Sequence, residues 1–447
     1  MIPPEVHTTP HSRERTPHMR RVSLALVALS ATAALALSGC SASSGDSGSA
    51  DGSVVKLLGA EDPATFAPVI SAFEAENKGT TVKYTQVPFD QLSSTLQQRL
   101  AAKDKDIDVY TVDQPNVSQL AAQGFLEDLS DLKDQAKKAT TPEQYSVNVY
   151  QDKLWALSVW NSTQMMFVNN DALAKAGIAA PSANPADRWT WEQTVDAGKA
   201  AQAAGSKWGL LFEQVEGYYQ LQPLAESLGG GSGITGKDML TADVTNPGWT
   251  KAMQWYADLY SNNVSPRGVG GFQTSPVFAD GDVPFFIGGP WDVGKFAENA
   301  KFNWSVVPMP AFAGGKAVTP NGSWSWGINP ASDHKDAAKK FLEFAALNPA
   351  GNLATTEKTT IIPANTEAQA KYLPTLEALG GTHSAGVADL ITEEIKNTAV
   401  PRPVSVGYVQ FESMMNKAFA DIRNGSPVEA RLKDAQSQIE AAWKKLR

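Results

Sequence analysis

Short apolar segments alternate with amphipathic segments directly after residue 53, and this alternation constrains the fold more than any other feature of the chain. Asp62 and Pro63 open the first amphipathic segment with an N-cap followed by proline at the first helical position. The pattern predicts strands at 54–58, 81–87 and 107–112, and helices from 63 onward, at 90–102 and at 117–123. Strands and helices that alternate through short connections predict an α/β fold with a largely parallel sheet in this region.

The length of the chain indicates two domains. About 390 of the 447 residues follow residue 53, whereas single cores usually stop growing at about 250 to 300 residues. Hydrophobic residues make up 42% and charged residues 19% of the chain, as in globular proteins. Further helices are predicted at 190–204, 247–260, 333–346, 411–423 and 427–446. We therefore expect a second domain that is rich in helices.

The beginning of the chain has the layout of an export signal. A basic start at 19–21 precedes an apolar run at 22–37 and then the residues Leu-Ser-Gly-Cys at 37–40. These four residues resemble the lipobox of bacterial lipoproteins, which implies that Cys40 is lipidated and becomes the first residue of the mature chain. We expect a cleaved signal peptide at 1–39. Residues 1–18 lack apolar character, which leaves a true start at Met19 open.

Residues 41–53 are Ser, Gly, Ala and Asp throughout, the composition of a flexible linker. The segment 40–53 is therefore interpreted as a lipid anchor and tether, which would hold the protein on the extracellular side of the cell membrane. Loss of residues 1–39 removes four arginines and two glutamates and changes the net charge from −9 to −11. Such an acidic protein lacks the basic footprint that nucleic-acid binding needs.

Motifs for catalysis, nucleotides or metals are weak in this sequence. Residues 231–238 match a phosphate-binding loop except at the last position, where Asp238 replaces the Ser or Thr that binds Mg²⁺. His334 and His383 are the only histidines after residue 39, and neither a zinc spacing nor a G-x-S-x-G elbow occurs. We expect no catalytic residues, no cofactor and no metal.

Aromatic residues flanked by amides and carboxylates follow or interrupt apolar runs at several places. Flat rings stack on the C–H faces of a pyranose, and amides and carboxylates bind its hydroxyls, so these residue types favour a carbohydrate pocket. The candidate ligand-binding residues are Glu61, Asp113, Gln114, Trp160, Asn161, Tyr218, Tyr219, Trp291, Asp292, Ser323 and Trp324.

Seven segments carry a resemblance to a known family, at 107–113, 154–157, 166–173, 189–192, 278–291, 307–315 and 326–330. Their order and spacing resemble those of the extracellular solute-binding protein family 1 of ABC importers, the maltose-binding-protein-like group. The resemblance covers essentially everything after the linker. It implies a periplasmic-binding-protein-like fold of two α/β lobes, joined by a hinge, with the ligand in the cleft between them. The implied lobes are 54–159 plus 325–364 and 160–324 plus 365–447.

The same resemblance implies roles for single residues. Trp291 and Tyr218 would stack on sugar rings, and Glu61 and Asp113 would accept hydrogen bonds from the opposite lobe. Some family members have a tryptophan just before the aspartate-containing loop. Thr111 and Val112 stand there in this chain, which favours a different or smaller sugar.

We therefore expect the monomeric substrate-binding lipoprotein of an ABC importer, which captures a mono- or oligosaccharide and delivers it to membrane permease subunits without chemical change. Two alternatives stay open from the residues alone. A secreted glycoside hydrolase or lyase would share the aromatic cleft but add a carboxylic acid of raised pKa. The same fold could instead bind a polyamine, an anion or iron, the last through the tyrosine pair 218–219.

Overall fold

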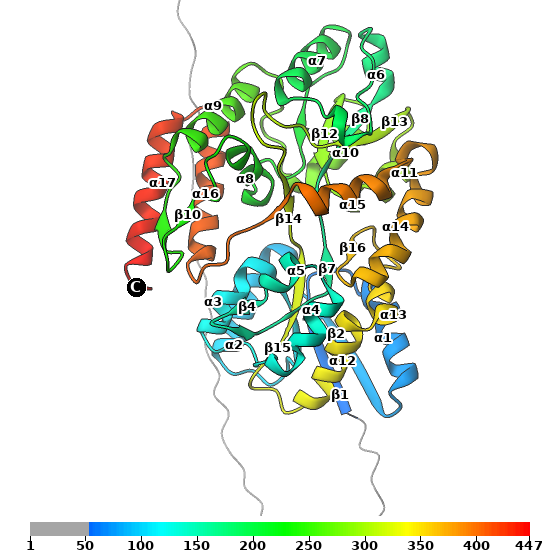
Figure 1. Cartoon of the computed structure of the whole chain (residues 1–447), viewed down its shortest axis with the longest axis vertical. Coiled ribbons are helices and arrows are strands. Elements are labelled where there is room, and N and C mark those ends of the chain that lie inside the picture. The colour runs from blue at the N-terminus through cyan, green and yellow to red at the C-terminus, as the bar shows by residue number, and fades with distance from the viewer. Residues whose placement is uncertain (1–52) are drawn as a thin grey trace, which may run out of the picture. The chain divides into compact units, whose positions relative to one another are not determined.

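The computed structural model describes residues 53–447 (Figure 1). This part of the chain contains two larger β-sheets, each covered by helices, four two-stranded sheets, and three places where the chain passes between the two larger sheets. The predicted signal peptide, the predicted lipidation at Cys40 and nearly all of the predicted linker lie outside the described residues. Within residues 53–447, no helix is both long and apolar enough to cross a membrane.

The first sheet has five strands in the order β2-β1-β3-β15-β6. β1 lies parallel between β2 and β3, and β15 runs antiparallel to β3 and β6. The strands are β1 Ser53–Gly59, β2 Thr80–Gln86, β3 Val109–Asp113, β6 Leu157–Ser158 and β15 Trp324–Ile328. The three predicted strands of this region are confirmed with small shifts at their ends, and the predicted parallel pairing holds among them.

Helix α1, Pro63–Glu76, begins as the sequence predicts, because the Asp62 side chain accepts a hydrogen bond from the Ala64 N–H at 2.8 Å. Pro68 lies inside the helix without ending it. Phe66, Val69 and Phe73 form its buried face. The other elements on this side are α2 Leu92–Ala101, α3 Val117–Ala122, α4 Lys133–Ala139, α5 Pro142–Ser146, β4 Val149–Tyr150, β5 Lys153–Leu154, α12 Lys335–Leu347 and α13 Pro349–Ala354.

The second sheet has four strands in the order β13-β8-β12-β9. β8 pairs antiparallel with β12 and β13, and β12 pairs parallel with β9. Every residue of β8 and β12 is buried, so helices or loops cover both faces of the sheet here. The strands are β8 Met165–Asn169, β9 Leu211–Phe212, β12 Phe285–Gly288 and β13 Trp304–Pro308.

Helices surround the second sheet, and α16 and α17 pack side by side next to α9 (Figure 1). The predicted capping box is present at the start of α7, where Thr190 and Gln193 exchange side-chain and backbone hydrogen bonds. The elements on this side are α6 Asn170–Lys175, α7 Trp191–Ala203, α8 Tyr218–Ser227, β10 Ile234–Thr235, β11 Thr241–Ala242, α9 Pro247–Ser261, α10 Thr274–Ala279, α11 Trp291–Asn299, α14 Thr366–Gly380, α15 Val387–Asn397, α16 Tyr408–Arg423 and α17 Val428–Trp443.

Short strands mark where the chain passes from one sheet to the other (Figure 1). After β6 of the first sheet, β7 Trp160–Asn161 leads to β8 of the second, and β14 Thr319–Asn321 leads back to β15. The third passage runs through β16 Ile362–Pro363, which pairs antiparallel with β7. β14 pairs parallel with β17 Ala399–Pro401. Two of the three passages are thus tied to each other by backbone hydrogen bonds.

Candidate functional site

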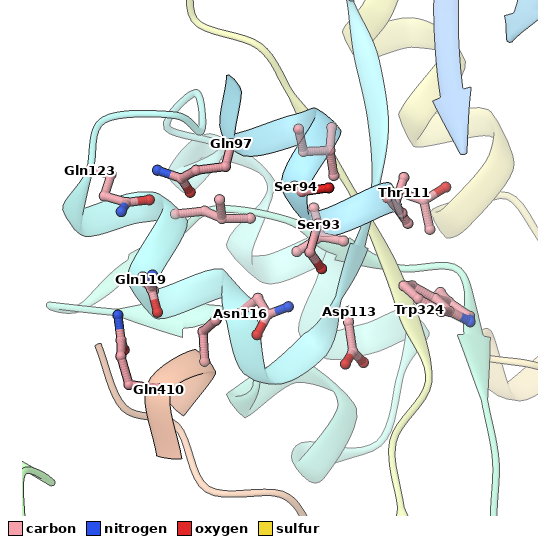
Figure 2. Close-up of a pocket in the computed structure, with 15 residues that line it drawn as sticks. Ser93, Ser94, Gln97, Thr111, Asp113, Asn116, Gln119, Gln123, Trp324 and Gln410 are labelled. Atoms are coloured by element: carbon pink, nitrogen blue, oxygen red, sulfur yellow. The ribbon is translucent and has the colours of Figure 1, made fainter. Parts of the chain in front are cut away.

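A cavity of about 460 Å³ lies among α2, α3, the end of β3 and the first turn of α16 (Figure 2). We call it the amide cavity, because amide side chains dominate its polar wall. Asn116, Gln119 and Gln123 share one side of α3 at helical spacing, whereas Val117 and Leu120 belong to the core. The polar lining residues are Ser93, Ser94, Gln97, Thr111, Asp113, Asn116, Gln119, Gln123 and Gln410.

Four polar atoms on this wall have no hydrogen-bond partner in the protein although they are buried. They are Thr111 Oγ1, Asn116 Oδ1, Gln119 Oε1 and Gln410 Oε1. Buried polar atoms in proteins are almost always hydrogen-bonded, and an unmet one costs about 1–3 kcal/mol. All four can accept a hydrogen bond. The residues that line the amide cavity are thus rich in amide and hydroxyl groups, which suit a ligand with several hydroxyls.

One aromatic residue lines the same cavity. Trp324, the first residue of β15, lines the cavity and is partly exposed. Phe89 meets it in a T-shaped contact, with ring centroids 5.6 Å apart and planes at 89°. A tryptophan held in this way can offer flat apolar area to a ligand that also uses the amide wall.

Asp113 is the carboxylate residue that lines the amide cavity, and it forms a bidentate ion pair with Arg402. Arg402 Nη1 donates to Asp113 Oδ2 at 2.8 Å, and Nη2 donates to Oδ1. Arg402 also lies over the Tyr219 ring, 5.2 Å from its centroid, and 3.6 Å from Glu412 Oε1. Burial alone would lower the pKa of Arg402, but the opposing charges of Asp113 and Glu412 hold that pKa well above its usual value.

A second polar cluster lies where β9 and β12 end. Trp291 Nε1 donates to Glu213 Oε1 at 2.7 Å, and Glu213 Oε2 is buried without a partner. Burial, assisted by the charge of Asp292, raises the pKa of Glu213 well above its usual value. None of these three residues lines the amide cavity.

Residues 59–352 match the sequence model of the bacterial extracellular solute-binding proteins. The chain belongs to this family. Within residues 53–447, no group of three or more His, Cys, Asp or Glu side chains could hold a metal ion.

Relatives of this solute-binding protein extend over most of its length. A binding protein of Brucella abortus is 26% identical over 410 residues, which cover 89% of this chain and 95% of the relative. The arabinooligosaccharide-binding protein of Bacillus subtilis is 24% identical over 349 residues, which cover 75% of this chain and 78% of that protein. The ABC substrate-binding protein of Listeria monocytogenes solved with cycloalternan has a TM-score of 0.76 at 21% identity, covering 88% of this chain and all of that one. These comparisons confirm the predicted two-lobed α/β fold of this group.

Two of the predicted ligand residues of the solute-binding protein, Asp113 and Trp324, line the amide cavity. The amides of α2, α3 and α16 were missed by sequence reasoning, as was Arg402. Asn116, Gln119 and Gln123 did carry a signal, because they form a polar stripe opposite apolar residues on one short helix. Gln410 and Arg402 carried none, because nearly 300 residues separate them from Asp113 in the chain.

Trp160 and Tyr218, two of the predicted ligand-binding residues, lie in the interior. Trp160 is 2% exposed, stacks on Phe66 and donates from Nε1 to Thr355 Oγ1 at 2.9 Å. Tyr218 is fully buried against Trp249, and its hydroxyl donates to a backbone carbonyl. A ring that stacks on a ligand needs an open face, and neither ring has one here.

Gln114 and Asn161 belong to a buried amide network at the passages between the sheets. Gln114 Nε2 donates to Gln144 Oε1 at 2.7 Å and to Ser158 Oγ at 3.1 Å. Gln114 Oε1 accepts from the Ser323 N–H at 2.8 Å. Asn161 Oδ1 accepts from Gln144 Nε2 at 2.8 Å and from Asn321 Nδ2 at 3.0 Å. The side chains of Gln114 and Asn161, which the sequence predicted to bind a ligand, therefore form hydrogen bonds with other groups of the protein.

The other predicted residues lie outside the amide cavity. Glu61 follows β1, and burial raises its pKa. The Tyr219 hydroxyl shares a 2.7 Å hydrogen bond with Ser162 Oγ, and the Arg402 guanidinium lies over the Tyr219 ring. Asp292 is fully buried, where Ser275 donates to Oδ1 at 3.1 Å. Asp292 lies in the first turn of α11.

Proposed function

We propose that this solute-binding protein captures a mono- or oligosaccharide in the amide cavity and delivers it unchanged to the permease subunits of an ABC importer. The observation that carries the sugar assignment is the cavity lining: amide and hydroxyl side chains, four of them with an unpaired buried acceptor, line the same cavity as Trp324. Sugars offer many hydroxyl donors and apolar C–H faces, and both find partners there. The oligosaccharides named for the Bacillus and Listeria relatives support the same ligand class.

The lining of the cavity favours binding over hydrolysis. Glycoside hydrolysis uses two carboxyl groups, which flank the bond to be broken. Among the described residues that line the amide cavity, Asp113 is the one carboxylate, so a pair of carboxyl groups is not assembled there. The family and its structural neighbours are binding proteins. We therefore propose that this protein is not an enzyme.

The non-sugar ligands fit the described residues less well. A tyrosine pair for iron is not assembled, because Tyr218 is fully buried and its hydroxyl is taken. A polyamine would need several free carboxylates, and an anion would need a free arginine. Asp113 and Arg402 instead neutralise each other at the edge of the cavity.

We propose further that the two sheets belong to two lobes, 54–159 plus 325–364 and 160–324 plus 365–447, which close on the ligand. The pairing of β7 with β16 supports a common hinge, because it joins two of the three passages. The cavity receives residues from both proposed lobes, since Val409 and Gln410 of α16 line it together with residues of α2 and α3. Closure of two such lobes is a known hinge mechanism.

Residues before 53 complete the proposal. We propose that Cys40 is the lipid attachment point, that 41–53 is the tether, and that the protein works as a monomer on the extracellular side of the membrane.

Isothermal titration calorimetry against a panel of mono- and oligosaccharides tests the function. We expect a 1:1 complex with at least one sugar, recovered intact afterwards by mass spectrometry. Turnover of the bound sugar would contradict the proposal, as would binding of polyamines, anions or ferric iron with no sugar bound.

A further inference from the structure

Arg402 lies on the second-sheet side of the protein and forms an ion pair with Asp113 of the first sheet. Asp113 is the last residue of β3 in the first sheet. Arg402 follows β17 and precedes α16, which packs in the core that the second sheet shares. The guanidinium and the carboxylate form two parallel hydrogen bonds across this boundary. Their side chains are only 9% and 21% exposed, so water screens the pair weakly.

Arg402 is held in place from the second-sheet side. Its guanidinium lies over Tyr219 of α8 at 5.2 Å, and Glu412 of α16 lies 3.6 Å away. Both helices pack in the core that contains Ile287 of β12. The Arg402 guanidinium is therefore held by residues of the second-sheet side while it pairs with Asp113 of the first sheet.

We propose that Arg402 is a positioning residue that fixes the Asp113 carboxylate at the cavity wall and latches the two lobes together before any ligand binds. Bidentate guanidinium–carboxylate pairs are among the strongest and most directional contacts in proteins. Separating this pair would break two charge-assisted hydrogen bonds at once. The latch therefore shifts the equilibrium between open and closed protein toward the closed form.

The latch does not exclude a ligand. A carboxylate has about four lone-pair sites, and Arg402 uses two of them. Asp113 still lines the cavity and can accept from a sugar hydroxyl there. The inference goes beyond the proposed sugar binding and rests only on the proposal that the two sheets belong to separate lobes.

Distances between spin labels, measured without any sugar, test the latch. Labels at Gln98→Cys on α2 and Lys433→Cys on α17 lie on exposed positions of opposite lobes. A Cys40→Ser background of the full chain removes its single native cysteine. We expect a narrow, short distance distribution in the otherwise native chain, and a broader and longer one after Arg402→Gln or Asp113→Asn. Arg402→Lys keeps the charge but loses the fork, so its distribution should be intermediate.

Glu394→Gln is the matched control. Glu394 pairs with Arg188 at 2.7 Å, and their side chains are 0% and 11% exposed, but both residues lie on the second-sheet side. This variant should leave the distribution unchanged. Unchanged distances in folded Arg402→Gln would overturn the latch, and so would an equal change in Glu394→Gln. If Arg402→Gln does not fold, the distances in Asp113→Asn and Arg402→Lys test the latch instead. In both variants residue 402 keeps a positive charge beside Glu412. Because no sugar is present, the result is independent of the ligand class.

Discussion

Replacing Gln119 by methionine should make the ligand-free protein more stable and its sugar binding weaker. Gln119 Oε1 is buried without a partner, and such an atom costs about 1–3 kcal/mol in the folded state. Methionine has nearly the same length and no such oxygen. We therefore expect the free energy of unfolding to rise by up to about 1–3 kcal/mol, measured as a higher melting temperature without ligand.

The same substitution removes an acceptor for the sugar. A bound hydroxyl that loses its partner in a closed cavity costs about 1–3 kcal/mol, which corresponds to about 5-fold to 150-fold weaker binding. Calorimetry with the sugar found in the panel measures this loss. The opposite signs of the two effects distinguish a ligand-binding amide from a structural one.

Gln220→Met is the matched control, because the amide of Gln220 is fully used by the protein. Its Nε2 donates to Gln164 Oε1 at 2.7 Å and to the Ile287 carbonyl at 3.0 Å, and its Oε1 accepts from the Gln214 N–H at 2.7 Å. This variant should lose stability. Our interpretation of the amide cavity would be refuted if Gln119→Met also lowered the melting temperature, or if it bound the sugar as tightly as the native chain.

Three further predictions concern other parts of the chain. Trp324→Ala should weaken sugar binding by at least about 1–2 kcal/mol, measured by calorimetry. Trp208 lies away from the cavity, so Trp208→Ala should leave the affinity unchanged. If Trp324→Ala bound the sugar as tightly as the native chain, Trp324 would not belong to the site. Burial raises the pKa of Glu213 above its usual 4.5, so the folded protein keeps a proton that the unfolded chain releases, and stability falls as pH rises above about 4.5. Glu213→Gln should reduce that fall in melts between about pH 5 and 8; an unchanged slope would contradict the assignment. Cys40→Ala should move the protein from the membrane to the soluble fraction with sugar affinity intact, and membrane retention would contradict the anchor.

The fold was predictable because its signals are local. The spacing of Phe66, Val69 and Phe73 and the cap at Asp62 are properties of one helix and its first turn. The strands of the first sheet alternate with such helices, and this order predicts the parallel pairing of β1 with β2 and β3. The pairing of β15 with β3 joins residues about 215 positions apart, and no local pattern could predict it.

The site was less predictable, because exposure decides what a residue does. Trp160 and Trp324 look alike in sequence, since each follows an apolar or small residue near a passage between the sheets. Packing against Phe66 buries the first, and the second stays partly open beside the cavity. Arg402 shows the other limit: the fold alone brings it from a distant loop to the carboxylate of Asp113.

The neighbours Asp113 and Gln114 link the ligand site to the proposed hinge. Asp113 faces the cavity and Arg402, whereas Gln114 is bound to Ser158 and Ser323, one on each of two passages. The buried amide network continues to Asn161 and Asn321 through Gln144 of α5. Because breaking several buried hydrogen bonds at once is costly, these passage residues should move as one rigid part. Asp113 is the chain neighbour of Gln114 in this network, so a ligand held by Asp113 would lie next to the passages about which the proposed lobes turn.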